Sequence, residues 1–173
     1  MIRIEDSSDL NWINLYRVAC QSAPLEISEA MLQQVDSGHA RFVDLIGRGV
    51  PSYGVTTGLG KLVGAELDEV ARAELPANML RARAVAIGTP FARRVARAML
   101  LIRLVNFLTG RSGVRSEVCR YLVDRLNDDF TPWVPSLGHG MAADAIANTH
   151  AFQTLIGEGF VYGPDQQRQP AAA

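Results

Sequence analysis

The sequence predicts an all-α protein with two long irregular loops. Apolar residues recur at the three- and four-residue spacing of helices over most of the chain, and no stretch shows the clear apolar–polar alternation of a half-buried strand. Two segments, 50–65 and 132–141, are rich in glycine and proline and fit no helical period. Residues 1–162 are expected to form a single domain. The polar segment 163–173, which ends in Pro-Ala-Ala-Ala, is expected to be a disordered tail.

The first two helices have recognisable ends. An apolar stripe over residues 10–18 predicts a short helix that ends before Pro24, because the residue before a proline avoids the helical region. Ser28 is the predicted N-cap of the second helix, and Glu29 stands beside the positive end of that helix. Its apolar stripe continues until Gly47, where glycines interrupt the pattern.

Four further helices are predicted after the first loop. Helix resumes there around Glu66, with a kink expected at Pro76, which removes one backbone donor. Pro90 fits the first turn of the helix that follows. That helix is apolar on nearly every side over residues 99–108, which is typical of a helix buried on most sides. In a chain this small, such burial favours a second copy, so a homo-oligomer is expected. Segments 114–126 and 142–156 are the last two predicted helices.

Composition and charge exclude several classes of protein. The chain has 17 Lys+Arg against 18 Asp+Glu, and this balance argues against nucleic-acid binding, which usually needs a basic excess. The apolar run 98–102 is too short to span a bilayer, and the N-terminal residues lack the apolar core of a signal peptide. A soluble cytoplasmic protein is therefore expected. Cys20 and Cys119 show no metal-ligand spacing and are expected to be buried free thiols.

The first loop carries a motif. It contains Ser52-Tyr53-Gly54-Val55-Thr56-Thr57-Gly58-Leu59-Gly60-Lys61, which resembles the Tyr-Gly-x-Asn-Thr-Gly-Phe-Gly segment of histidine and phenylalanine ammonia-lyases. The resemblance continues in order through segments 78–80, 88–90 and 103–115, and so covers most of residues 10–160. It implies the fold of the N-terminal helical domain of the aromatic amino acid lyases. It also implies that Tyr53 is a catalytic acid/base; the alternative is a structural tyrosine that seals a turn.

The second loop departs from that family. Its members have Gly-Ala-Ser-Gly-Asp there, and the Ala-Ser-Gly part cyclises into methylidene-imidazolone (MIO), an electrophilic prosthetic group. Here Met141-Ala142-Ala143 stands in its place. Ala142 has no hydroxyl to eliminate, and Ala143 lacks the flexibility that glycine gives to the attacking residue. No MIO and no other cofactor is therefore expected. The chain also stops before the family's long helical bundle, so we expect a site that is local or completed by another subunit.

The resemblance extends the candidate site beyond Tyr53. His139 lies in the loop expected to face Tyr53, and a histidine suits proton transfer near neutral pH; the alternative is a surface histidine. Arg83 stands where histidine lyases place a His and is the candidate for binding an anionic substrate, although an ion pair with a carboxylate is the alternative. Leu59 and Asn78, which lie in matching segments, complete the substrate-binding candidates. Tyr53, Arg83 and His139 are expected to line one pocket.

Other polar residues are expected to be structural. Asp144 is predicted to cap the last helix, and His150 is predicted to lie on the surface of that helix. Arg93, Arg94 and Arg97 are expected to form a solvated helix face.

Two functions of different class remain open. The first is a small-molecule enzyme that uses Tyr acid/base chemistry without MIO, as an isomerase, dehydratase, lyase or cyclase, in specialised biosynthesis. The second is a non-catalytic binding module, or one half of a split ammonia-lyase that needs a partner chain.

Overall fold

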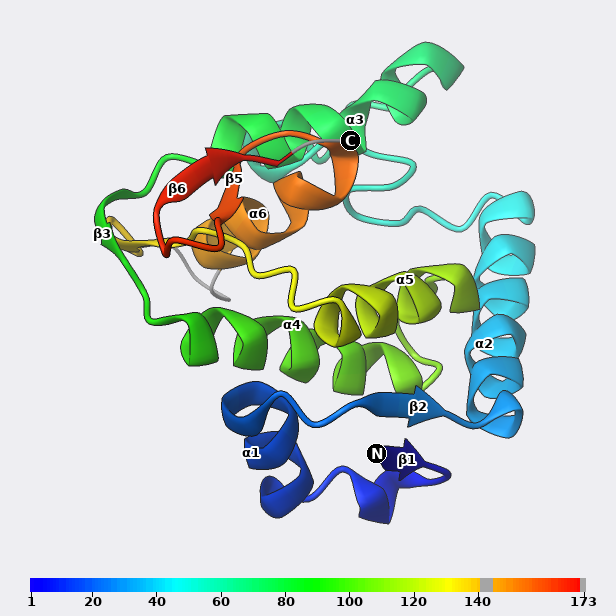
Figure 1. Cartoon of the computed structure of the whole chain (residues 1–173). Coiled ribbons are helices and arrows are strands. Elements are labelled where there is room, and N and C mark those ends of the chain that lie inside the picture. The colour runs from blue at the N-terminus through cyan, green and yellow to red at the C-terminus, as the bar shows by residue number, and fades with distance from the viewer. Residues whose placement is uncertain (141–144, 172–173) are drawn as a thin grey trace.

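The structure is a computed structural model that describes residues 1–140 and 145–171 (Figure 1). Its α-helices are α1 (Trp12–Gln21), α2 (Glu29–Gly47), α3 (Glu69–Arg83), α4 (Arg93–Leu108), α5 (Ser116–Asn127) and α6 (Ala145–Gln153). Its short strands are β1 (Ile2–Ile4), β2 (Leu25–Ile27), β3 (Ile87–Pro90), β4 (Pro135–Leu137), β5 (Phe160–Tyr162) and β6 (Arg168–Pro170). The predicted helical fold class is confirmed, and the strands pair only two by two.

Helix α4 is the centre of the core. It packs against α1 on one side and against α5, α2 and α6 on the others (Figure 1). Leu100, Leu104 and Leu108 are fully buried on α4, as its apolar sequence predicts. Ile102 on the same helix nevertheless remains 54% exposed, so one strip of this apolar helix stays at the surface. Within the described part of the chain, no helix combines the length and apolarity that a membrane crossing requires.

Side-chain caps set where the helices begin. The Ser28 side chain accepts a hydrogen bond from the Met31 N–H, which confirms the predicted N-cap of α2. Asp68 caps α3 in the same way, through a 2.8 Å bond from Ala71 N to its Oδ1. The predicted start of α4 at Pro90 is wrong by three residues, because Pro90 ends β3 and pairs with β4 before the helix begins.

The N-terminus forms a small β-α-β unit. Strand β1 pairs in parallel with β2, and α1 connects them. Ile2 and Ile4 point into the core, each less than 5% exposed. The Asn127 side chain at the end of α5 bonds both the N–H and the C=O of Leu25, at 2.8 and 2.9 Å. These contacts hold a three-residue strand that is too short to show alternation in the sequence.

The C-terminal segment corrects the prediction of a disordered tail. Strand β6 pairs antiparallel with β5, with Arg168 opposite Tyr162. The Arg168 guanidinium lies 4.2 Å from the centre of the Phe160 ring, and Ala171 is buried at 4% exposure. Main-chain hydrogen bonds therefore order a segment whose polar composition suggested disorder.

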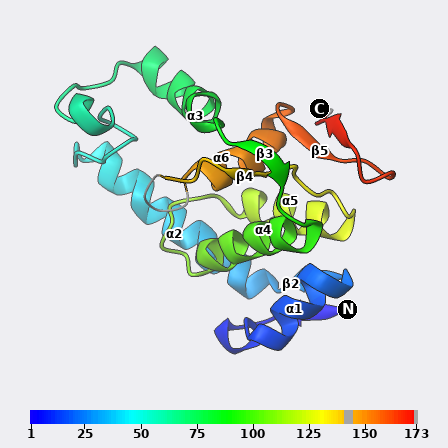
Figure 2. The ribbon, with the colours of Figure 1, turned by 90° about the vertical axis from the view of Figure 1, so that its left-hand side faces the viewer.

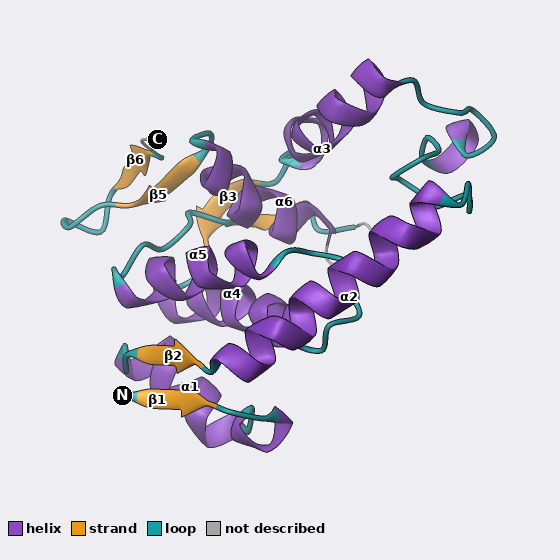
Figure 3. Cartoon of the chain, turned by 90° about the vertical axis from the view of Figure 1, so that its right-hand side faces the viewer, coloured by secondary structure: helices purple, strands orange, loops and turns teal. Residues whose placement is uncertain are grey.

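The first predicted loop lies away from the core. After α2 the chain runs through an irregular stretch and a 3₁₀ turn (Gly60–Leu62) before α3 starts. This segment and the start of α3 extend beyond the rest of the molecule (Figures 2 and 3). No residue of α3 is buried, although α3 packs against α6. The second predicted loop is less irregular than expected, because it contains β4, which pairs with β3.

Candidate functional site

The first loop, residues 50–65, carries Tyr53 and is called the tyrosine loop below. It begins with a compact turn built around Ser52. The Ser52 carbonyl accepts hydrogen bonds from the N–H groups of Val55 and Thr56, at 3.1 and 3.0 Å. The Thr56 hydroxyl oxygen in turn accepts the N–H of Ser52 at 2.9 Å. Gly54 has a φ of +71°, a conformation that glycine adopts without strain. Thr56, which replaces the Asn of the related motif, thus ties the loop to its own start.

This turn leaves the side chain of Tyr53 largely exposed to solvent, at 64%. Its phenol oxygen accepts a hydrogen bond from the peptide N–H of Gly60 at 3.0 Å. The ring is therefore held in one orientation by a backbone donor seven residues away.

The remaining predicted binding residues lie around the same loop and on α3. Leu59 packs close to Gly54, because a Cβ added at Gly54 would come within 2.9 Å of the Leu59 Cδ2. Asn78 is exposed and accepts a 3.4 Å hydrogen bond from Arg81. Arg83 is half-buried at the last position of α3, and no hydrogen bond or ion pair joins it to another described residue. Arg83 is therefore a cation that the described part of the fold leaves uncompensated.

Arg81, two residues before Arg83 on α3, forms the ion pair with a carboxylate that was the alternative role for Arg83. Its Nε lies 2.9 Å from the Glu158 carboxylate, which follows α6. Hydrogen bonding to Arg81 holds the pKa of Glu158 below its usual range, and the same bond raises the pKa of Arg81. Of the two neighbouring arginines, one joins α3 to the end of α6 and the other stays available.

His139 lies in a different environment. Its Nε2 is 2.7 Å from the Pro135 carbonyl oxygen, and its ring centre is 5.5 Å from that of Phe91. It lines a cavity of about 250 Å³ together with Phe91, Met99, Ile102, Arg103 and Asn148. Neither Tyr53 nor Arg83 is among the described residues that line this cavity. The pocket predicted to unite Tyr53, Arg83 and His139 thus remains a hypothesis, with His139 in a cavity of its own.

His150 is engaged in the fold, as predicted. Its Nε2 accepts the Ala86 N–H at 3.0 Å. Burial lowers the pKa of His150, and the nearby His139 lowers it further. The predicted cap at Asp144 and the Met141-Ala142-Ala143 segment lie outside the described residues. The sequence of that segment does not fit MIO, because neither the hydroxyl to be eliminated nor the glycine that closes the ring is present.

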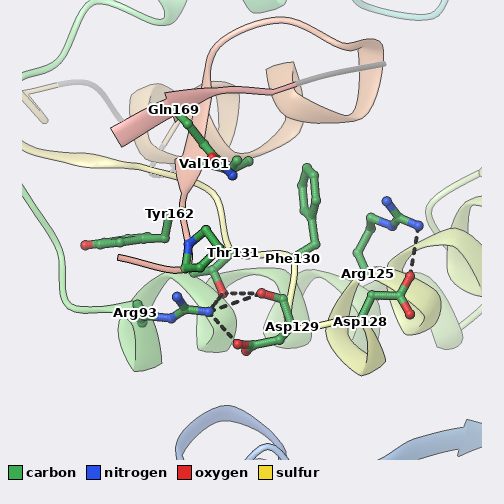
Figure 4. Close-up of a pocket in the computed structure, with 11 residues that line it drawn as sticks. Arg93, Arg125, Asp128, Asp129, Phe130, Thr131, Val161, Tyr162 and Gln169 are labelled. Atoms are coloured by element: carbon green, nitrogen blue, oxygen red, sulfur yellow. Dashed lines mark hydrogen bonds and ion pairs between the residues drawn. The ribbon is translucent and has the colours of Figure 1, made fainter. Parts of the chain in front are cut away.

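A cluster of arginines that the sequence assigned to solvent is largely engaged within the protein. Arg97 is 2% exposed and lies 3.0 Å from the Asp129 carboxylate. Arg93 contacts the same carboxylate at 2.6 Å (Figure 4). The prediction of a solvated face is therefore wrong for Arg97. The i, i+4 spacing of Arg93 and Arg97 was the available signal, since it places both on one side of a helix. A shallow pocket of about 450 Å³ adjoins this cluster, but its arginines already bind carboxylates.

No group of three or more His, Cys, Asp and Glu side chains suited to a metal ion occurs within 1–140 and 145–171. Cys119 is fully buried, and burial raises the pKa of its thiol to about 11, whereas Cys20 is exposed. The expectation of two buried thiols is thus correct for Cys119 and wrong for Cys20.

The helical fold and the tyrosine loop define the class of protein. A sequence model of the family described as "Aromatic amino acid lyase" matches residues 10–173, and the chain belongs to this family. It is 35% identical over 155 residues to a histidine ammonia-lyase of Streptomyces griseus, covering 89% of this chain and 30% of that protein. It is 32% identical to the MIO-dependent tyrosine 2,3-aminomutase of Streptomyces globisporus, over 84% of this chain and 27% of that enzyme.

Solved structures agree with this assignment. The tyrosine aminomutase from Streptomyces globisporus superposes with a TM-score of 0.83 at 29% identity, over 92% of this chain and 30% of that one. Ergothionase from Treponema denticola, an ergothioneine-degrading enzyme, gives 0.85 at 26% identity, over 98% and 34%. The chain thus spans about 30% of the length of the curated relatives it matches. The family resemblance and the helical fold predicted from the sequence are both confirmed.

Proposed function

We propose that the chain supplies Tyr53 as the acid/base of a small-molecule enzyme of the lyase, isomerase, dehydratase or cyclase type, which works without MIO in cytoplasmic specialised biosynthesis. The hydrogen bond from Gly60 N–H to the Tyr53 oxygen carries this proposal. It orients the phenol at the tip of a turn, where the hydroxyl can meet a substrate molecule. Family membership supports the lyase-type class of the reaction.

The proposed substrate is a small molecule with a ring and a carboxylate. The names of the relatives refer to histidine, tyrosine and ergothioneine, all of which have both features. Arg83 is the proposed partner of the carboxylate, since its planar fork matches two oxygens. Leu59 and Asn78 are the proposed apolar and polar neighbours of the substrate. Tyr53 then takes a proton from one substrate atom and returns it to another.

The absence of MIO is part of this proposal. Ala142 and Ala143 offer no route to cyclisation. The intact mass of the purified protein is expected to equal that of the sequence. A mass short by two waters, mapped to residues 138–144, would contradict this part of the proposal.

The exposure of the site supports a functional unit larger than one chain. Tyr53 is 64% exposed and α3 buries no residue, whereas acid/base chemistry gains from the exclusion of water. We propose that a second copy covers the loop, in a homo-oligomer. The second candidate function, one half of a split ammonia-lyase or a non-catalytic module, is favoured by the same exposure, with a partner chain in place of the second copy.

Proton exchange tests the tyrosine directly. The protein is incubated in heavy water with histidine, tyrosine, phenylalanine and their deaminated acids, and proton NMR follows deuterium uptake at carbon. Tyr53→Phe is expected to lower exchange roughly a hundredfold or more, the usual scale for losing a proton-transfer group. Tyr16→Phe, a change at a half-exposed tyrosine on α1, is the matched control and is expected to exchange as the wild type does. Equal exchange in Tyr53→Phe contradicts the acid/base role.

Oligomeric state separates the two candidates. Light scattering at micromolar concentration is expected to give a multiple of the chain mass. A single-chain mass, with exchange appearing only after the rest of the Streptomyces griseus histidine ammonia-lyase is added as a separate chain, would favour the split-lyase function instead.

A further inference from the structure

The cavity beside His139 is separate from the tyrosine loop and has an apolar wall. It lies where the end of β3, the exposed strip of α4, the loop after β4 and α6 come together, elements that are neighbours in Figure 2. Phe91, Met99, Ile102 and Ala147 supply this wall. Ile102 is 54% exposed, so the wall is open to a molecule from solvent. About 250 Å³ of space accommodates one ring with a short side chain.

Polar groups at the same cavity have no partner within the described parts of the chain. Arg103 is half-buried, and no ion pair or hydrogen bond joins its guanidinium to residues 1–140 or 145–171. By contrast, Arg93 and Arg97 on the same helix are paired with Asp129. Asn148, on α6, likewise makes no side-chain hydrogen bond to a described residue. A cation and an amide beside an apolar wall match a ligand that has a ring and a carboxylate.

His139 adds a hydrogen-bond acceptor, because its contact with Pro135 decides which ring nitrogen carries the hydrogen. The Pro135 carbonyl oxygen can only accept a hydrogen bond, so Nε2 of a neutral His139 carries the hydrogen and Nδ1 carries the lone pair. That Nδ1 is buried and has no hydrogen-bond partner among the described residues. Buried polar atoms without partners are uncommon in native proteins, and an unfilled ligand contact is one of their causes. The cavity therefore offers an acceptor, a cation and an apolar surface.

We propose that this cavity binds a small aromatic acid that also carries a hydroxyl or amino group. The ring lies against Phe91 and Met99, the carboxylate pairs with Arg103, and the hydroxyl or amino group donates to Nδ1 of His139. This site is independent of Tyr53, and binding at it does not require the proposed reaction. The cavity is thus a second ligand-binding site, which the motif around Tyr53 does not predict.

A ligand series on the unaltered protein is the first test. Titration calorimetry measures 3-(4-hydroxyphenyl)propanoate, its neutral amide and 3-phenylpropanoate. The hydroxy acid is expected to bind at least about tenfold more tightly than the amide, because a charge-assisted hydrogen bond is lost with the carboxylate. It is also expected to bind more tightly than the acid without the hydroxyl. Equal affinity of acid and amide, or no binding of any of them at millimolar concentration, overturns the proposal.

Variants and NMR locate the binding. Arg103→Met keeps the length of the side chain and is expected to weaken binding of the hydroxy acid at least about tenfold. Arg94→Met, at an exposed position of the same helix, is the control and should leave it unchanged. The nitrogen-15 signal of His139 Nδ1 is expected to move on binding, as a lone pair gains a donor. Unchanged affinity in Arg103→Met, or an unmoved Nδ1 signal, contradicts the assignment.

Tyr53→Phe separates this inference from the proposed function. It is expected to keep full affinity for the hydroxy acid even where proton exchange is lost. Loss of binding in Tyr53→Phe would place the ligand at the tyrosine loop and overturn the inference.

Discussion

The guanidinium of Arg97 lies 3.0 Å from the carboxylate of Asp129, although Arg97 is almost completely buried and Asp129 is 58% exposed at its side chain. The same guanidinium donates to the backbone oxygens of Val18 and Leu126, at 3.1 and 3.0 Å. One side chain of α4 thus joins α1, α5 and the turn after α5. Burial lowers the pKa of Arg97, and Asp129 opposes that effect.

Removing the charge of Asp129 is expected to destabilise the fold. Asp129→Asn keeps the shape and tolerates the φ of +56° at this position, but leaves a buried cation without its counter-charge. We expect a loss of about 2 kcal/mol, below the usual range for a fully buried pair because Asp129 faces solvent. Asp128→Asn, which disrupts an exposed pair with Arg125, is the control and should cost less than about 0.5 kcal/mol. Urea unfolding measures both, and equal losses would contradict the special role of Asp129.

Gly38 is expected to reject any side chain. A Cβ at this position would lie 1.9 Å from the Gly110 carbonyl oxygen, so α2 and the turn after α4 cannot keep their spacing. Gly38→Ala should lower the free energy of unfolding by roughly 3 kcal/mol or more. Gly47→Ala, at the last position of α2 with nothing within 4 Å, should instead stabilise by up to about 1 kcal/mol. A lower thermal unfolding temperature in Gly38→Ala and a higher one in Gly47→Ala would confirm the prediction. An unchanged unfolding temperature in Gly38→Ala would contradict it.

Stability is expected to fall as the pH is lowered below 6.5, the ordinary pKa of histidine. Burial lowers the pKa of His150 from its ordinary value of 6.5, so the folded state favours the neutral imidazole that accepts the Ala86 N–H. The unfolded chain binds this proton at higher pH than the folded one, so the stabilisation is present above 6.5 and is lost as the pH falls through the lowered pKa. Denaturation at a series of pH values should show a shallower decline in His150→Gln. An identical decline in both proteins would assign the effect to other groups.

The two cysteines are expected to differ in reactivity. Cys20 is exposed, whereas burial raises the pKa of the Cys119 thiol to about 11, which leaves almost no thiolate at pH 8. A disulfide reagent should therefore modify one thiol quickly in the native protein and the second only after unfolding. Cys20→Ser should abolish the fast phase, and a fast phase that persists in this variant would show that Cys119 is accessible.

Local signals predicted the helices well. The α2 helix follows from its Ser28 cap, its apolar stripe and the glycines at its end, all of which lie within one segment. The paired strands could not be predicted in this way. Three residues are too few to show alternation, and β1–β2 and β5–β6 are held by main-chain bonds between separate segments. The order of residues 163–171 was missed for the same reason.

The candidate site shows the same difference between features with a local sequence signal and features that depend on distant segments. The motif around Tyr53 pointed to its loop, because the glycines and the tyrosine are consecutive. The burial of Arg97 depends on Asp129, which comes from a segment 32 residues further along the chain. The separate cavity of His139 depends likewise on α4, which no local pattern relates to the loop after β4.

The two hydrogen bonds between the Asn127 side chain and the main chain of Leu25 affect how the protein folds during translation. The two residues are 102 positions apart, and both main-chain groups of Leu25 depend on this one amide. In a nascent chain, the main chain of Leu25 therefore cannot gain these two hydrogen bonds until α5 has left the ribosome. Until then, the apolar side chains at the start of the chain remain uncovered and open to chaperones. The protein is expected to fold late in translation, with its first residues among the last to settle.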